Sequence, residues 1–327
     1  EVLKTENTTR MTIKTTHAEQ AIRDKRIRSF KRAIFLLSFI FIPTVYFLIF
    51  YVYVNCNSFV MAFQLTRRGV GTYWTLENFT RFFGELSTNG SEMGEAFRNT
   101  FITFGVNMLM FFVGFFVSFF LYKKIFMYRF FKICFFLPSL IAGTIINSVF
   151  MQVIGVNGPV AEIVKNLYHL DYMPDLLDEP RFANKVILGN LMWLNFPMNM
   201  VLLSGSFGRI PESVLESAKL DGANWLQEAF KIVIPMVWPT VGLLLMMNIA
   251  GVFGSSGNVF LLTQGDAGTQ TLSNWMYMQL YNVSGNPEES NAFNYMSAVG
   301  LLLTVISVTI ALTVRKLSDK MFGEVQY

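Results

Sequence analysis

The chain has 327 residues, of which 53% are hydrophobic, 16% aromatic and 15% charged, and its formal net charge is +4. Soluble domains carry roughly 25% charged residues, so this composition excludes an ordinary soluble domain. The small positive balance reflects where Lys and Arg lie along the chain, and it implies no nucleic-acid partner.

Six windows of the sequence contain no Asp, Glu, Lys or Arg. They are 33–66, 99–122, 133–161, 186–208, 232–265 and 290–314. A hydrocarbon core of about 30 Å needs roughly 20 apolar residues in a helix, so each window is long enough to span it. The pattern predicts an all-α integral membrane protein with six transmembrane helices, at about 33–54, 99–122, 133–154, 186–206, 236–260 and 295–314.

Individual residues refine these spans. Pro43 predicts a kink in the first span. A helix beginning at Glu92 is expected to lead into the second span, and the third contains Pro138 and Gly143 in its first half. A short helix is predicted at 160–168, in the loop between the third and fourth spans.

Most of the 26 Lys and Arg residues fall in 1–32, 123–132, 209–231 and 315–327. The positive-inside rule therefore places both termini and the 209–231 loop in the cytoplasm. Residues 1–32 are predicted to be a basic cytoplasmic segment before an uncleaved first span, because the apolar run behind them is longer than that of a signal peptide. Residues 33–314 form the transmembrane domain, and 315–327 a cytoplasmic tail.

The loop 209–235 is polar and lies between two apolar spans. Pro211 suits the first turn of a helix and Glu212 adds a favourable charge there, so a helix is predicted over 212–220. A second short helix is expected over 224–233, ended by Pro235 and Pro239. The segment is therefore predicted to be a helix–turn–helix lying across the cytoplasmic face; an ordinary interfacial loop is the alternative.

The spacing within this loop resembles the EAA loop of permease subunits in binding-protein-dependent ABC importers. The matching residues are Glu216, Ala218, Gly222, Ile232 and Pro235. Ser217 stands where the family usually has Ala. The resemblance implies that this loop docks the cytoplasmic ATPase, with coupling residues Glu216, Ala218, Asp221, Gly222, Ala223 and Pro235.

The resemblance covers nearly all of the chain after residue 30. It is strongest to carbohydrate permeases, the group that includes the larger membrane subunit of the maltose transporter, and within it to permeases for oligosaccharides and polysaccharide fragments. It implies a six-span subunit with the fold of type I ABC importer permeases in a bacterial plasma membrane. The implied partners are a second homologous permease, two ATPase subunits that bind ATP and Mg, an extracellular solute-binding protein and an oligosaccharide. The chain itself is expected to bind no cofactor and to catalyse no reaction.

A neutral sugar is recognised by aromatic stacking and by uncharged hydrogen-bonding groups. Several residues of these types lie in the predicted spans and are candidates for the substrate path: Asn147, Trp193, Asn195, Asn199, Asn248, Ser255, Asn258 and Tyr295. Three glycines, Gly251, Gly254 and Gly257, predict a break in the fifth span that lines the path. The alternative is that these small and polar residues serve helix–helix packing.

Other chemistries lack the residues they need. The sequence has only two His and two Cys, no cluster of metal ligands and no phosphate-binding loop of the Walker type. The acidic group at 171–179 is read as a solvated loop in preference to a cation site. A secondary transporter or a membrane-embedded enzyme would need ionisable residues within the spans, and the six windows contain none. Another uncharged solute in place of an oligosaccharide remains an alternative.

Overall fold

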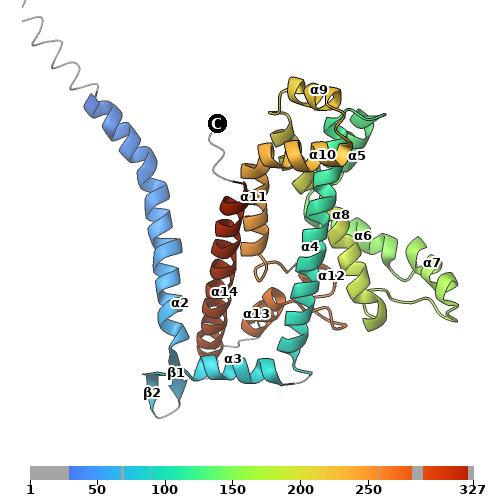
Figure 1. Cartoon of the computed structure of the whole chain (residues 1–327). Helices are drawn as coiled ribbons and strands as arrows, with labels where there is room; N and C mark the ends of the chain where they lie inside the picture. The colour runs from blue at the N-terminus through green and yellow to red at the C-terminus, as the bar shows by residue number, and fades with distance from the viewer. Residues whose placement is uncertain (1–28, 68–69, 89, 257, 282–289, 323–327) are drawn as a thin grey trace, which may run out of the picture. The chain divides into compact units, whose positions relative to one another are not determined.

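The computed structural model describes residues 29–67, 70–88, 90–256, 258–281 and 290–322, and in these the chain is mostly helical (Figure 1). The predicted basic segment up to residue 28, Gly257 and the end of the tail from 323 lie outside the described residues. The chain divides into two compact units, Glu1–Val60 and Met61–Tyr327. Within the described residues, five helices are long and apolar enough to cross a membrane, and up to six if one bent pair counts as a span.

The described part of the first unit is one helix, which runs from Ser29 to Ala62 just beyond the boundary. It contains a π-helical segment, η1 (Phe47–Tyr53), and ends in α2 (Val54–Ala62). Pro43 lies inside this helix, and no residue from 29 to 60 is buried. A helix that is apolar on every face and uncovered by its own chain has the character of a membrane span.

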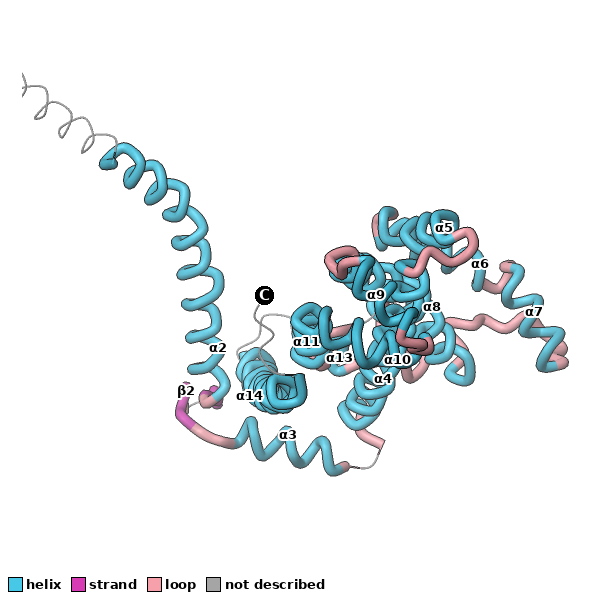
Figure 2. Tube along the Cα trace, turned by 45° about the horizontal axis from the view of Figure 1, so that its top comes forward, coloured by secondary structure: helices cyan, strands magenta, loops and turns pink. Residues whose placement is uncertain are grey.

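The second unit begins with a hairpin of β1 (Gln64–Arg67) and β2 (Gly71–Trp74), in which Leu65 pairs with Tyr73. The sequence analysis did not predict it. Helix α3 (Glu77–Ser87) follows and lies across the ends of two long helices of the same unit, α4 (Glu92–Tyr122) and α14 (Ser290–Phe322) (Figures 1 and 2). Asn291, in the first turn of α14 (Ser290–Phe322), accepts a bond from the Thr66 backbone N–H and donates one to the Thr66 carbonyl, both 2.8 Å long. These bonds replace a missing neighbouring strand and fix the hairpin.

Helix α4 (Glu92–Tyr122) begins where the sequence predicts, because the Ser91 side chain caps it by accepting the Gly94 N–H. It packs against α8 (Pro180–Phe207), which contains Pro197 without ending there. Phe111, Phe115 and Phe119 of α4 form a buried core with residues of α8 and of α11 (Ile234–Ala250). This core fixes the three helices side by side.

The predicted third span is wrong as a single helix. It is a pair, α5 (Tyr128–Leu140) and α6 (Gly143–Ile154), bent by 102° at the break. Ile141 has extended backbone (φ −91°, ψ 139°). Pro138 lacks the N–H needed for the helical ladder and Gly143 loses more entropy than other residues on becoming helical, so a break between them costs little. The short helix expected at 160–168 is present as α7 (Pro159–Tyr168).

The fifth span also differs from its prediction at both ends. Pro235 and Pro239 do not end a helix, because α10 (Trp225–Gln227) runs through η2 (Glu228–Val233) into α11. In η2 the Ile234 N–H bonds to the Ala229 carbonyl, and this wider turn is where the helix adapts ahead of Pro235. The helix stops at Ala250, ten residues before the predicted end. A turn then leads to α12 (Val259–Leu262), α13 (Leu272–Tyr281) and α14, which packs against α11 (Figure 2).

Candidate functional site

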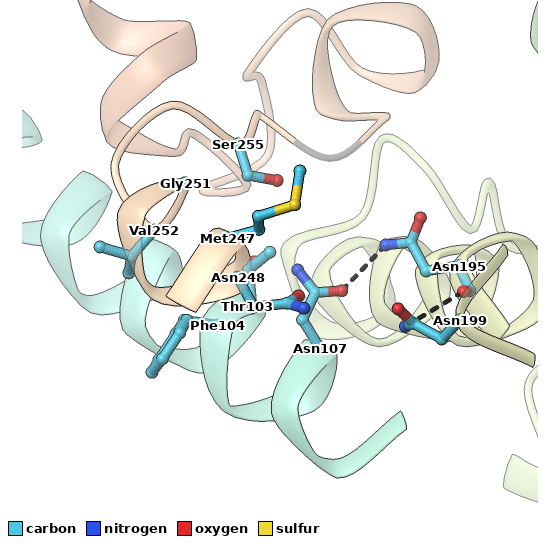
Figure 3. Close-up of a pocket in the computed structure, with 10 residues that line it drawn as sticks. All are labelled: Thr103, Phe104, Asn107, Asn195, Asn199, Met247, Asn248, Gly251, Val252 and Ser255. Carbon is cyan, nitrogen blue, oxygen red and sulfur yellow. Dashed lines mark hydrogen bonds between the residues drawn. The ribbon is translucent and has the colours of Figure 1, made fainter. Parts of the chain in front are cut away.

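A cavity of about 260 Å³ lies between α4, α8 and the end of α11 (Figure 3). It brings together four of the predicted path residues, Asn195 and Asn199 of α8, Asn248 of α11 and Ser255 of the following turn. The other lining residues are Gly251, which belongs to the predicted glycine break, and five that the sequence analysis missed: Thr103, Phe104, Asn107, Met247 and Val252. A polar stripe lies on one face of α4 and consists of Asn99, Thr100, Thr103 and Asn107. This spacing is the sequence signal that could have identified Thr103 and Asn107.

Six of the ten residues that line the cavity have polar side chains, and none of the ten is charged. The Asn195 side-chain amide donates to the Asn107 side-chain oxygen over 2.8 Å, which links α8 to α4 at the cavity (Figure 3). Asn248 donates to the Leu244 carbonyl of its own helix over 2.9 Å. Each amide keeps further donor or acceptor capacity, since an amide group has two N–H donors and a carbonyl. The site is therefore suited to a neutral ligand rich in hydroxyl groups.

The end of α11 and the turn that follows it form one wall of this cavity. Gly251 caps the helix, and Gly251, Val252 and Ser255 lie on the turn beside Met247 and Asn248. Irregular backbone at membrane depth is tolerated where it lines a cavity or is buried in protein. The predicted break in the fifth span thus lies next to a cavity, although it ends the helix instead of interrupting it.

Four predicted path residues lie outside this cavity. Trp193 is exposed, with its ring 6.3 Å from that of Phe150. Tyr295 is 2% exposed and donates to Glu85 of α3 over 2.7 Å, so it fastens α3 to α14. Asn147 and Asn258 belong to a separate hydrogen-bond chain through Asn190.

This chain of three asparagines joins α6, α8 and the start of α12. Asn258 donates to the Asn190 side-chain oxygen over 2.5 Å, and Asn190 donates to that of Asn147 over 3.1 Å. Asn190 and Asn147 are both buried. Because each bond joins different helices, the geometry matches the packing alternative for Asn147 and Asn258.

Replacing Asn190 with Leu should destabilise the protein without touching the cavity. The change leaves the Asn147 oxygen and the Asn258 amide without their shared partner, at a cost of about 1–3 kcal/mol. The thermal melting temperature of the purified protein in detergent should fall. Ser148→Ala is the matched control on α6, since Ser148 is exposed and bonds only within its own helix. An unchanged melting temperature for Asn190→Leu would contradict this assignment.

The 209–235 segment forms α9 (Glu212–Leu220), a turn at Gly222, and α10, which continues into α11. Because the sequence analysis predicts that this segment docks an ATPase, we refer to residues 209–233 as the docking loop. Gly222 has φ +79° at the end of α9. The Ala223 N–H bonds to the Ala218 carbonyl and the Gly222 N–H to the Lys219 carbonyl, which is the Schellman arrangement that favours glycine. Asn224 and Gln227 then cap α10 reciprocally, over 2.9 and 3.0 Å.

The predicted coupling residues divide by exposure. Glu216, Asp221 and Gly222 are exposed, whereas Ala218 is buried and Ala223 and Pro235 are partly buried. Leu220, which the sequence analysis did not single out, is 89% exposed at the turn. An exposed leucine beside exposed carboxylates offers a partner both apolar and charged contacts.

The C-terminal end of α4 holds the docking loop. The Tyr122 hydroxyl donates to the Ile210 carbonyl over 2.9 Å, and Lys124 pairs with Glu212 over 2.7 Å. The hydrogen bond between this pair raises the pKa of Lys124 and lowers the pKa of Glu212, so both stay charged at neutral pH. Lys123 pairs with Glu228, whose side chain is only 1% exposed.

In the loop 169–179 two of the four acidic side chains form local hydrogen bonds. The Asp175 carboxylate accepts the Leu177 and Asp178 N–H groups, and Glu179 accepts from the Tyr172 hydroxyl. Among the residues that the structure describes, no three His, Cys, Asp or Glu side chains gather as metal ligands would.

Apolar helices that contain an uncharged cavity rich in asparagine, together with an exposed helical loop, define a polytopic α-helical membrane protein. Residues 110–323 match the family of binding-protein-dependent transport system inner membrane components, and the chain belongs to this family.

Individual relatives and solved structures are consistent with this assignment. The chain is similar to the arabinooligosaccharides transport system permease protein AraP of Bacillus subtilis, at 25% identity over 85% of this chain and 86% of AraP. It is also similar to the multiple sugar-binding transport system permease protein MsmF of Streptococcus mutans, at 25% identity over 58% of this chain and 63% of MsmF. A chain in the crystal structure of a bacterial ABC transporter involved in the import of the acidic polysaccharide alginate has TM-score 0.72 and 18% identity, covering 90% of this chain and 98% of that one. At this identity the likeness establishes the fold, that of an ABC importer permease.

Proposed function

We propose that this chain is a permease subunit of an ATP-driven importer that passes a neutral oligosaccharide through the membrane. The observation that carries the proposal is the cavity between α4, α8 and α11, whose lining contains four asparagine side chains and no charged residue within the described chain. A neutral ligand rich in hydroxyl groups can bond to the amide donors and acceptors. The lining holds no positively charged side chain that would pair with an acidic sugar. The names of AraP and MsmF support the same substrate class.

The proposal includes partners. The exposed turn at Gly222 is one docking surface for one ATPase subunit, whereas ATP hydrolysis in this class of transporter requires two such subunits closing on each other. A second permease of similar fold supplies the other loop and the other wall of the path. An extracellular solute-binding protein delivers the sugar, and ATP and Mg bind to the ATPase subunits. The Lys and Arg distribution supports placing the docking loop and both termini in the cytoplasm.

The test is uptake by the complete complex in proteoliposomes. ATP-dependent accumulation of a labelled neutral oligosaccharide is expected, with at least tenfold lower accumulation of an acidic oligosaccharide of equal length. A complex with a hydrolysis-deficient ATPase subunit is the control and should accumulate neither. Equal or preferential uptake of the acidic sugar would overturn the substrate assignment, and uptake of a small uncharged osmolyte alone would favour the alternative solute class.

A further inference from the structure

Three consecutive residues at the C-terminal end of α4 contact the docking loop on both sides of its turn. Tyr122 and Lys124 bond to Ile210 and Glu212 at the start of the loop. Lys123 bonds to Glu228, which lies beyond the turn in the helix that becomes α11. The end of α4 is thereby tied to both halves of the docking loop.

The two lysine pairs differ in their surroundings. Lys124 and Glu212 have side chains 62% and 70% exposed, so water screens their attraction. The Glu228 side chain is 1% exposed and that of Lys123 21%, and the other Glu228 oxygen is buried without a hydrogen-bond partner among the described residues. A carboxylate in this position depends on its single cation, because separating the two would leave an uncompensated buried charge.

Aromatic packing surrounds the same junction. The Trp225 ring of α10 lies 5.6 Å from Phe120 and 6.5 Å from Phe116 of α4, and Phe116 lies 6.0 Å from Phe230. The junction therefore combines an ion pair on a buried carboxylate with aromatic contacts, in which Trp225 and Phe230 remain 46% and 53% exposed.

The helices joined at this junction also line the cavity. Thr103 and Asn107 extend from α4, and Met247 and Asn248 from α11. Asn107 lies 16 residues before Lys123 on the same uninterrupted helix, a distance of about 24 Å at 1.5 Å per residue. A displacement of the docking loop that is transmitted at Lys123 and Glu228 reaches the cavity through rigid helices.

We propose that the Lys123–Glu228 ion pair is a positioning contact that makes the docking loop, α4 and α11 move as one body, so that ATPase motion changes the cavity. The proposal rests on the proposed function. Glu228 acts through α4 and α11, and it touches neither the substrate nor the exposed docking surface.

The experiment measures cavity motion in the complete complex. The exposed Cys56 and Cys134 are replaced by Ser, and Thr103→Cys is introduced as a reporter whose reaction with a water-soluble maleimide is followed on this chain by mass spectrometry. ATP is expected to change the labelling rate several-fold in this parent. Glu228→Gln and Lys123→Met should each reduce the ATP-dependent change at least fivefold while ATPase subunits stay bound and continue to hydrolyse ATP.

Lys124→Met is the matched control, because it removes a neighbouring lysine from a screened pair, and its ATP-dependent change should stay within about twofold of the parent. The proposal would be overturned if Glu228→Gln and Lys123→Met both kept the full ATP-dependent change in labelling rate. Should either single variant fail to assemble, the exchanged pair Lys123→Glu with Glu228→Lys is measured: assembly with a restored ATP response supports the contact, and assembly without one refutes it. If the labelling rate of the parent with the Thr103→Cys reporter did not change with ATP, and its complex took up no sugar, the proposed function itself would be contradicted.

Discussion

A Gly222→Trp variant is expected to insert into the membrane at normal levels and to lose its ATPase subunits. Gly222 adopts φ +79°, where an L side chain costs about 1–2 kcal/mol. Apart from the two chain neighbours of Gly222, no atom lies within 4 Å of a Cβ added at this position, so a new side chain begins in open space. The bulk therefore projects from the exposed turn into the space that a docked partner would occupy. Co-purification of the ATPase, measured per mole of permease, should fall at least tenfold, with uptake falling in parallel.

Two control variants separate bulk from backbone strain. Gly222→Asn adds a small side chain that tolerates positive φ, so it should retain the ATPase nearly as well as the wild type. Gly84→Trp places the same indole at another open glycine, on α3, where it should leave ATPase retention unchanged. Normal ATPase retention by Gly222→Trp would remove this turn from the docking surface.

The spans were predictable because absence of charge over about 20 residues has one main physical explanation. The same rule says nothing about whether an apolar stretch is straight. Residues 133–154 pass it as a single span, yet Ile141 is extended and the helix turns by 102°. Prolines are equally ambiguous. Pro138 precedes a break, whereas Pro197 and Pro235 lie in continuing helices. Before Pro235 a π-helical turn accommodates the missing N–H.

The structure of the docking loop was easier to predict from the sequence than the lining of the cavity. Pro211, Gly222 and Asn224 have local backbone roles, and local roles follow from residue type and spacing. Whether a side chain in a bundle of membrane helices faces a cavity or another helix depends on how the neighbouring helices pack. Asn195 and Asn258 are the same residue type in adjacent apolar segments, yet one lines the cavity and the other joins a buried packing chain. Lys123 and Glu228 are 105 residues apart, and no pattern in either segment predicts their pairing.

An Asn107→Leu variant is expected to reduce uptake about 10- to 100-fold at normal permease abundance. Leu has a similar size but removes the acceptor for the Asn195 amide and one hydrogen-bonding group from the cavity. Losing one or two hydrogen bonds to a bound sugar, at about 1–1.5 kcal/mol each, accounts for that range. Initial uptake rates in proteoliposomes, normalised to assembled complex, measure it.

Asn190→Leu distinguishes this loss from a general effect of removing an intramembrane amide. It should lower permease abundance and melting temperature, with near-normal uptake per assembled complex, because Asn190 bonds to Asn147 and Asn258 and does not line the cavity. We therefore expect Asn107→Leu to lower the uptake rate at normal abundance, and Asn190→Leu to lower abundance and melting temperature at a near-normal uptake rate. If Asn107→Leu instead lowered abundance while each assembled complex transported normally, the α4–α8 bond at Asn107 would be packing, and the sugar would have to pass along another face of these helices.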